Sequence, residues 1–308
     1  MIDFTNCEKR NKAYSGANGN KISVIYNDAL YMLKFPSLPT KTDALSYTNS
    51  CISEYIGCKI FKMLEIPVQE VELGTYRVNE KVKLVVACKD FATGGFVLQD
   101  FASLKNQIID SERNGYGTEI EDVLDTIRKQ TVMDADKLEE FFWNMFIVDA
   151  LIGNWDRHNG NWGFLYNQMT DEVKLAPIFD CGSSLYPQAD EEMMRSILEN
   201  KGELHHRVYN IPTSALVQNG KKIKYFDFLS SMEYKACNDA LRRIVPRIDM
   251  KELHQLIDTI PYIDDLQKEF YKTMLSARKE LILDFAYQKV LKKKMDYIPV
   301  VKPRRPRL

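Results

Sequence analysis

The sequence lacks the features of several protein classes. No apolar run approaches the ~20 residues of a membrane-spanning helix. The N-terminus has neither the apolar core nor the cleavage site of a secretory signal. The net charge is only −1, so no field of the whole molecule would attract nucleic acid or acidic lipid. We therefore expect a soluble, cytoplasmic protein with no membrane or nucleic-acid partner.

The six cysteines also lack a metal-binding or disulfide pattern, because no C-x-x-C pair occurs among them. This scatter predicts reduced thiols in a reducing compartment. Cys51 and Cys58 lie two helical turns apart and can share a helix face. Two ligands do not make a zinc site, so buried packing is the favoured interpretation. No internal repeat or low-complexity linker divides the 308 residues.

What the chain does contain is a polar loop at Gly153–Asn161, G-N-W-D-R-H-N-G-N. Phosphoryl transfer needs a carboxylate to orient the acceptor hydroxyl and oxygen ligands for magnesium ions. Asp156 suits the first task, and Asn161 and Asp180 suit the second. Such a loop taken alone is more often an ordinary turn. Asp180 favours a site because it ends an apolar run, Val173–Phe179, that we interpret as a buried strand.

Alternating residues near the N-terminus predict a hairpin with strands at Ile22–Tyr26 and Leu30–Phe35. The loop before it, Tyr14–Lys21, reads Y-S-G-A-N-G-N-K. Its backbone N–H groups could cover phosphates, and an ordinary hairpin loop fits equally well.

A lysine in the second of these strands suggests a link to the next element. Lys34 lies in an otherwise apolar run and needs a counter-charge there. Glu54, near the apolar stripe of a predicted helix at Tyr47–Leu64, is the candidate partner. Kinases hold a strand lysine against the nucleotide phosphates with such a glutamate. The alternative is that both residues are solvated surface side chains.

Two more strands, Val68–Tyr76 and Val82–Phe91, complete a small predicted sheet. The glycine-containing break at Ala92–Phe96 is interpreted as a hinge between two lobes. From Leu98 onward the pattern predicts mainly helices. The hinge would place an adenine slot against the backbone of five residues, Ala87, Cys88, Lys89, Asp90 and Phe91.

The strongest helical pattern is Ala135–Ile152, which is apolar on most faces and predicts the central helix of the larger lobe. We therefore expect an α+β, two-lobed fold. Its N-terminal lobe would span residues 1–91, its helical C-terminal lobe residues 92–288, and a basic, disordered tail residues 289–308.

The stretch after Asp180 is interpreted as an activation segment. Ser183, Ser184 and Tyr186 are candidate phosphorylation sites, or else they cap a helix predicted at Asp190–Leu198.

The predicted tail is basic and contains Lys292, Lys293, Lys294, Lys302, Arg304, Arg305 and Arg307. Such a run is usually a solvated end and less often an interaction or import segment. In the second case, host import machinery would be the partner of the tail.

With these residues collected, the chain resembles the HipA-like serine/threonine kinases. The resemblance covers nearly the whole chain and includes L-G-T-Y, V-V-A-C-K-D-F and P-I-F-D-C-G-S-S-L-Y-P-Q-A-D. It implies a kinase-like fold, the use of ATP and Mg²⁺, protein substrates and autophosphorylation. It extends to a cell-translocating, proinflammatory member of the family, which implies secretion and action inside a host cell.

The resemblance also implies residue roles. Asp156 would be the catalytic base, His158 would support the phosphate or the loop, and Asn161 and Asp180 would bind magnesium. Lys34 would contact the phosphates and pair with Glu54. The nucleotide would be covered by Gly16, Ala17, Asn18, Gly19, Asn20 and Lys21.

Departures from the family pattern limit what is carried over. HipA has a subdomain before its glycine loop that helps contact a DNA-binding antitoxin, and this chain begins almost at the loop, so no antitoxin partner is expected. The regulatory serine of HipA has only Ser15 as a displaced counterpart. The metal-binding triplet is D-C-G in place of D-F-G, so a Phe-driven switch is not assumed.

Two other functions remain open from sequence. The loop also fits the D-R-H-x-x-N pattern of lipid-kinase-like enzymes, so a small-molecule or lipid kinase is an alternative. A catalytically weak nucleotide-binding interaction protein is another. Against it stand five competent side chains, Lys34, Glu54, Asp156, Asn161 and Asp180.

Overall fold

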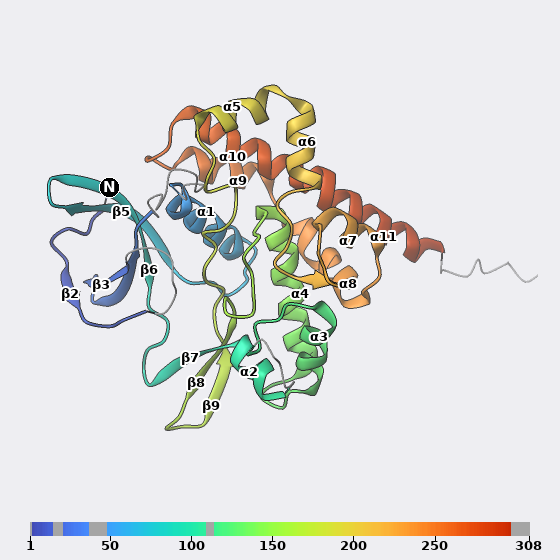
Figure 1. Ribbon diagram of the computed structural model, residues 1–308, viewed down its shortest axis with the longest axis horizontal. Helices are drawn as coiled ribbons and strands as arrows, with labels where there is room; N and C mark the ends of the chain where they lie inside the picture. The colour runs from blue at the N-terminus through green and yellow to red at the C-terminus, as the bar shows by residue number, and fades with distance from the viewer. Residues whose placement is uncertain (1, 15–20, 37–47, 109–113, 297–308) are drawn as a thin grey trace, which may run out of the picture.

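The computed structural model describes residues 2–14, 21–36, 48–108 and 114–296. Its N-terminal part is a six-stranded sheet with the strand order β1-β5-β6-β4-β3-β2, on the left of Figure 1. Strand β1 runs parallel to β5, and the other neighbours are antiparallel. The strands are β1 (Ile2–Asp3), β2 (Glu8–Arg10), β3 (Lys21–Tyr26), β4 (Ala29–Lys34), β5 (Val71–Val78) and β6 (Lys81–Lys89).

Strand alternation decides which way the β4 side chains point. Tyr31 and Leu33 belong to a small core on one face of the sheet, whereas Met32 belongs to the large core that includes α1 (Ser50–Met63). Lys34 lies two positions after Met32, so it shares the α1 face. The predicted hairpin and helix are therefore confirmed, and their geometry aims Lys34 at the helix.

A second sheet follows the hinge in the order β7-β8-β9. Strand β7 (Phe96–Asp100) shows that the predicted helical onset at Leu98 is wrong, because its residues pair with β8 (Gly163–Asn167). The buried strand predicted at Val173–Phe179 is also shorter. Strand β9 (Glu172–Leu175) is partly exposed, and the buried part of the predicted run follows it, where Ile178 forms an isolated bridge with Val68.

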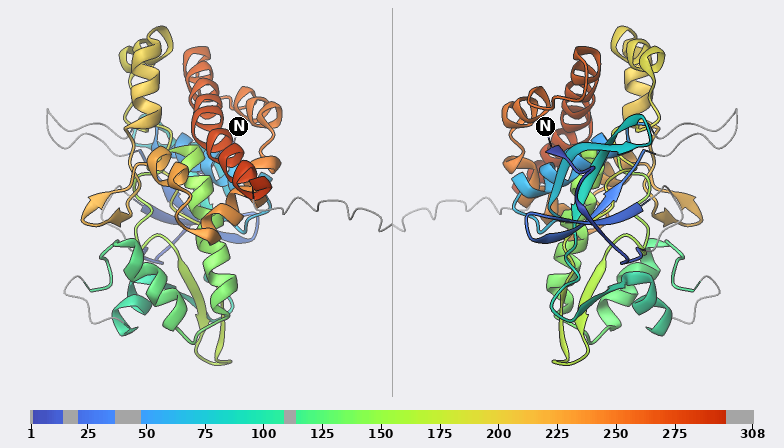
Figure 2. Two further views of the ribbon diagram at one scale, coloured as in Figure 1. Left: turned by 90° about the vertical axis from the view of Figure 1, so that its right-hand side faces the viewer. Right: turned by 90° about the vertical axis from the view of Figure 1, so that its left-hand side faces the viewer.

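The C-terminal part is helical and occupies the right of Figure 1. Helices α5 and α6 pack against α10, and Figure 2 shows them on one side of the long α10–α11 arm. The helices are α2 (Phe101–Ile108), α3 (Ile120–Lys129), α4 (Ala135–Ile152), α5 (Glu191–Glu199), α6 (Lys201–Tyr209), α7 (Tyr225–Ser231), α8 (Lys235–Ile244), α9 (Met250–Asp258), α10 (Asp265–Arg278) and α11 (Phe285–Asp296). A short hairpin of β10 (Val217–Gln218) and β11 (Lys221–Lys222), a 3₁₀ turn at Val245–Arg247 and a π-helical turn at Lys279–Asp284 complete it.

Helix α4 matches the predicted bounds and forms the centre of this part. The Asp134 side chain accepts a hydrogen bond from Lys137 N at its N-terminus. Gly153 ends it with a left-handed backbone, φ 62°, which a glycine adopts without steric penalty. The polar loop predicted from Gly153 therefore leaves the C-terminal end of a buried helix.

The last helix changes the prediction for the tail. Helix α11 runs to Asp296, and Val290 is 2% exposed in the large core. The predicted start of a disordered tail at Lys289 is therefore wrong, because apolar burial of the helix holds this part of the chain. Residues 297–308 lie outside the described residues. No helix within residues 2–14, 21–36, 48–108 and 114–296 has both the length and the apolar character to cross a membrane.

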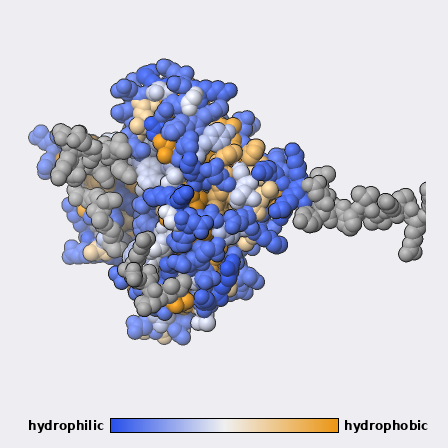
Figure 3. Space-filling model, turned by 45° about the vertical axis from the view of Figure 1, so that its right-hand side comes forward, coloured by the Kyte–Doolittle hydropathy of each residue, from blue (hydrophilic) through white to orange (hydrophobic). Residues whose placement is uncertain are grey.

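The molecule has two lobes, a sheet with one covering helix and a larger helical part, as predicted. The face shown in Figure 3 is mainly hydrophilic, with hydrophobic residues in small groups. The two lobes meet where α1, β6 and the segment after β9 come together, and Lys34, Glu54 and Asp180 lie at this junction.

Candidate active site

Lys34, Glu54 and Asp180 come from three separate elements and meet at one point. Lys34 Nζ lies 2.9 Å from Glu54 Oε2 and 2.9 Å from Asp180 Oδ1. The Glu54 side chain is 1% exposed and that of Asp180 is 45% exposed. The lysine thus bridges a buried carboxylate on α1 and an accessible carboxylate after β9. The sequence predicted the first of these contacts, between Lys34 and Glu54.

The charges of this group shift each other's protonation. Burial opposes the charge on Lys34, but the Asp180 and Glu54 carboxylates outweigh it and raise the pKa of Lys34. The nearby Lys34 ammonium lowers the pKa of Asp180 to about 2, against a smaller opposing effect of burial. Lys34 and Asp180 therefore both stay charged near neutral pH.

Glu54 also fixes the backbone next to Asp180. Its Oε1 atom accepts a hydrogen bond of 3.1 Å from Cys181 N, while Oε2 accepts from Lys34. Asp180 has a left-handed backbone, φ 58°, which Asp tolerates better than most residues. This turn sends the Asp180 side chain to Lys34 and the following N–H to Glu54.

The polar loop is held by hydrogen bonds within itself. Asn154 Oδ1 accepts from Asp156 N at 3.0 Å, and Asn161 Nδ2 donates to Asp156 O at 2.8 Å. His158 Nδ1 accepts from Gly160 N at 3.0 Å, so the proton of a neutral His158 is on Nε2. Burial raises the pKa of Asp156, partly offset by His158. The side chains of Asp156 and His158 are half-buried and lie close enough to interact.

Arg157, which the sequence analysis passed over, ties this loop to the segment that carries Asp180. Its guanidinium donates to Asn161 O at 3.0 Å, to Phe179 O and to Cys181 Sγ at 3.4 Å. Because these groups precede and follow Asp180, one side chain sets the separation of the two predicted metal ligands. Its planar fork of donors suits this task.

The Arg157 charge is balanced inside the protein by Asp149 of α4. Arg157 Nε donates to Asp149 Oδ2 at 3.0 Å, and the two side chains are 4% and 1% exposed. Burial raises the pKa of Asp149, and the Arg157 charge counteracts this effect. An acidic residue in an otherwise apolar helix was the sequence signal for this pair, because a buried carboxylate needs a partner.

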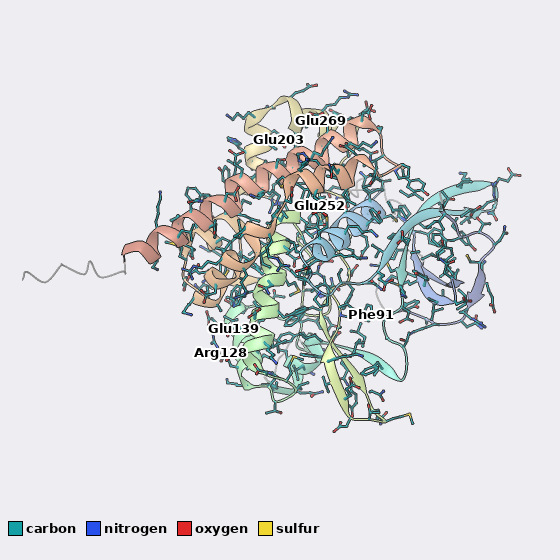
Figure 4. The ribbon with its side chains drawn as sticks, turned by 180° about the vertical axis from the view of Figure 1, so that it is seen from behind. Phe91, Arg128, Glu139, Glu203, Glu252 and Glu269 are labelled. Atoms are coloured by element: carbon teal, nitrogen blue, oxygen red, sulfur yellow. The ribbon has the colours of Figure 1, made fainter. Side chains whose placement is uncertain are left out.

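The chain at and just before the hinge is tied to the irregular segment that precedes the glycine-containing loop. Asp90 accepts hydrogen bonds from Lys12 Nζ and from Tyr14 OH, the latter at 2.9 Å. Phe91 lies between the sheet and the second sheet in Figure 4, and its ring is 5.7 Å from that of Phe179. The hinge therefore contacts both the start of the loop and the residue before Asp180.

The sheet uses part of the backbone predicted to line an adenine slot. Ala87 and Cys88 pair with β4 on one side and β5 on the other. Lys89 N donates to Glu70 O, and Asp90 N donates to Leu30 O. Among these five residues, Phe91 is therefore the one whose backbone N–H is not used by these sheet hydrogen bonds.

Of the predicted nucleotide-covering loop, residues 16–20 lie outside the described residues. Lys21 begins β3 directly opposite Lys34. Burial, and then the charge of Lys34, lower the pKa of Lys21. The loop therefore returns to the sheet beside the Lys34 group.

This geometry agrees with what comparisons of the sequence and structure show. Residues 13–252 match the family described as HipA-like C-terminal domain. The chain belongs to this family. The sequence is 51% identical over 292 residues to the serine/threonine-protein kinase CtkA of Helicobacter pylori strain J99, covering 94% of this chain and 89% of that protein.

Solved structures support the same assignment. The crystal structure of a Helicobacter pylori proinflammatory kinase, CtkA, matches with a TM-score of 0.86 and 47% identity, covering 96% of this chain and 99% of that one. HipA of Shewanella oneidensis, in a complex with HipB and operator DNA, matches with a TM-score of 0.56 at 17% identity over 92% of this chain and 68% of that one. The likeness to HipA shows the fold alone. The family match and the similarity to CtkA show that the protein is a HipA-like kinase.

In this HipA-like kinase the proposed activation-segment hydroxyls are not all available. Ser184 is 0% exposed and donates to Cys181 O at 2.6 Å. Tyr186 is 3% exposed and donates to Arg207 O at 2.7 Å and to Ile211 O. The N-cap of α5 is Asp190, so these side chains do not cap the helix either. In this conformation only Ser183 of the three predicted sites is partly exposed.

Proposed function

We propose that this HipA-like kinase transfers the γ-phosphoryl group of ATP to serine or threonine hydroxyls of proteins. It is a serine/threonine-protein kinase, the class of its 51% identical relative. The observation that carries the proposal is Lys34 Nζ, held 2.9 Å from both Glu54 and Asp180. A lysine so fixed between two carboxylates provides a preorganised charge for nucleotide phosphates.

Asp156 is proposed as the residue that orients the acceptor hydroxyl and accepts its proton. Asp156 is half-buried, and it lies in a loop that hydrogen bonds of Asn154 and Asn161 hold in place. Burial raises the pKa of Asp156. A general base works best when its pKa is near the pH of the reaction, so this shift favours the proposed role. His158 is proposed to hold the loop through Gly160 and to present Nε2–H toward the transferring group.

Asn161 and Asp180 fit the expected magnesium site by their chemistry. Asn161 uses its Nδ2 atom to hold Asp156 O, so its amide oxygen is the atom left for a metal. The Asp180 side chain is 45% exposed and hydrogen-bonds Lys34 through Oδ1 only. No cluster of three or more His, Cys, Asp or Glu side chains in the described part of the chain could hold a metal ion. Bound Mg²⁺ would neutralise phosphate charge there and take further oxygen ligands from the phosphates and water.

The remaining predicted contacts are proposed around this centre. The Gly16–Lys21 loop would cover the phosphates, since Lys21 lies opposite Lys34. Asp90 and Phe91 would border the adenine, and residues 1–91 would form the nucleotide-binding lobe.

Label transfer from γ-labelled ATP tests the proposal. The full chain is incubated with Mg²⁺ or with EDTA, and with a generic protein, a phosphoinositide or an aminoglycoside as acceptor. We expect label on serine or threonine of the protein acceptor, mapped by mass spectrometry, and none with EDTA. Label only on the lipid or the aminoglycoside would replace the proposed acceptor class by the small-molecule alternative.

Autophosphorylation and action in a host cell are further proposals. The solved relative is described as a proinflammatory kinase, and the basic C-terminal residues could engage import machinery. Mass spectrometry of the incubated kinase would locate its own phosphosite. Purified kinase added to cultured epithelial cells should enter them and activate an inflammatory reporter, and kinase lacking residues 297–308 should enter less. Equal entry would refute the role of the tail.

A further inference from the structure

A turn next to the polar loop, Gly115–Tyr116–Gly117, is fixed by a buried side chain of that loop. Asn159 is 1% exposed, and its Nδ2 atom donates to Gly115 O at 2.8 Å and to Gly117 O at 2.9 Å. Both carbonyls that flank Tyr116 are therefore bonded to the segment that carries Asp156. This contact fixes the position of Tyr116 relative to the proposed catalytic base.

Two glycines allow the turn to pack this closely. Gly115 has φ 77°, and a Cβ atom there would be 1.8 Å from Ala102 O. A Cβ atom on Gly160 would be 3.0 Å from Tyr116 Cε1, so the tyrosine ring lies against the backbone of the loop. The Tyr116 and His158 ring centroids are 6.1 Å apart. The aromatic ring thus borders the polar loop directly.

The ring itself remains largely open to solvent. Tyr116 is 52% exposed, although Asn159 and Gly115 already hold the turn without it. An exposed aromatic side chain on a rigid turn contributes little to folding. Its place beside the loop suits contact with another molecule.

The carboxylate of Asp100 lies at the end of the ring. Tyr116 OH is 3.4 Å from Asp100 Oδ2. The other oxygen, Asp100 Oδ1, accepts from Ser103 N at 2.8 Å and from Ser103 Oγ at 2.6 Å. Asp100 forms no ion pair with a residue of the part of the chain that the structure describes. Among the described residues, the donors that contact this carboxylate are all neutral.

We propose that Asp100 and Tyr116 form a subsite for a lysine or arginine side chain of the protein substrate, next to the acceptor serine or threonine. This inference rests on the proposed kinase function and names a feature of its substrates. A cation over the ring face can bind the aromatic quadrupole and the carboxylate together. Tyr116 contacts Gly160 and His158, which belong to the same loop as Asp156. In the substrate, the cationic residue would therefore lie within a few positions of the acceptor serine or threonine.

A peptide panel tests the subsite. Each peptide contains one serine, and a single arginine is placed at one of the four positions on either side, with glutamine as the matched neutral residue. For the parent we expect arginine to raise kcat/KM about tenfold at one or two neighbouring positions. The preference should weaken in high salt, because the interaction involves a partly exposed charge.

Asp100→Asn and Tyr116→Leu should each reduce the preference for arginine to about twofold or less. Asn at 100 keeps the oxygen that accepts from Ser103, so α2 should remain capped. The matched controls are Asp171→Asn and Tyr166→Leu, because Tyr166 OH donates to Asp171 at 3.2 Å in the β8–β9 hairpin. Both controls should retain the parent preference.

The outcomes separate the subsite from the proposed function. A parent that phosphorylates serine peptides without preferring arginine overturns the subsite and leaves the kinase function in place. Variants at Asp100 and Tyr116 that keep the full preference, including its salt dependence, also overturn it. A parent that labels neither a serine peptide nor itself overturns both proposals.

Discussion

At the scale of single residues, Arg157 has the largest structural role among the side chains that sequence analysis passed over. It donates to groups on both sides of Asp180 and to the backbone of Asn161, while Asp149 balances its charge. A lysine could supply the charge but not the planar fork of donors. The separation of the two proposed metal ligands therefore depends on a residue whose own side chain is buried.

Arg157→Met is expected to lower both stability and turnover. The variant leaves Asp149 as a buried, unpaired carboxylate, which costs about 3–5 kcal/mol. Unfolding by urea and label transfer measure the two effects. In Asp149→Asn/Arg157→Met, much of the stability should return because the buried charge is gone, but turnover should not. If turnover returned as well, Arg157 would serve only to balance charge.

Glu54→Gln tests the charge that Glu54 supplies to Lys34. Glutamine keeps an oxygen for Cys181 N but loses the ion pair with Lys34. We expect kcat/KM for ATP to fall about 10- to 100-fold, because a hydrogen bond to a charged group is lost. The control is Glu72→Gln, whose contact with Lys59 is 3.8 Å long and partly exposed, and it should change kcat/KM less than about twofold.

At the scale of elements, the packing of α1 against the segment after Asp180 explains the D-C-G triplet. A Cβ atom on Gly57 of α1 would be only 2.7 Å from Cys181 Cβ. Cys181 is 0% exposed and also contacts Arg157. No room remains here for a larger side chain, so a phenylalanine at 181 would push α1 and Glu54 away from Lys34.

Gly57→Ala is therefore expected to destabilise the protein, although alanine is the better helix former. The added methyl group overpacks the contact with Cys181, which costs about 1–3 kcal/mol, against a propensity gain of about 1 kcal/mol. Urea unfolding measures the net change. In the control, Gly202→Ala in α6, the added Cβ would contact only the Asn200 side chain at 3.2 Å. Stability of the Gly57 variant equal to or above that of the parent would contradict this packing.

Local patterns predicted several elements and missed those that depend on pairing across the chain. Helix α4 and the β3–β4 hairpin follow from periodicity. Strand β7 was missed because its partner, β8, lies far along the sequence, after α4. The Lys34–Glu54 pair was predicted, because a charge in an apolar strand needs a partner, whereas the contact of Asp180 with Lys34 was not. The Asn159 contact with the Tyr116 turn was not, because it depends on backbone carbonyls that have no sequence signal.

At the scale of the whole molecule, the C-terminal helix α11 extends the packed core at least to Val290. Lys289 donates to Ser230 O at 2.8 Å, and Val290 is buried in the large core. A basic composition predicted a disordered tail from Lys289, but composition does not show that one face of a basic helix is apolar.

Two truncations test this boundary. A chain that ends after Asp296 should unfold at the same temperature as the parent and retain its turnover. A chain that ends after Gln288 loses the buried Val290, so its Tm should fall by at least about 3 °C. Calorimetric melting curves measure both. Equal Tm values for the two truncations would show that the end of α11 does not stabilise the fold.

The most direct measurement of the central claim compares the parent with Asp156→Asn in two assays, label transfer from γ-labelled ATP and calorimetric binding of Mg–ATP. We predict that the variant binds nucleotide within about threefold of the parent, because Lys34, Glu54 and Asp180 are unchanged. Its label transfer should fall by about 10²- to 10⁴-fold, because the variant lacks the carboxylate proposed to accept the hydroxyl proton. Transfer by Asp156→Asn at the parent rate would contradict the account.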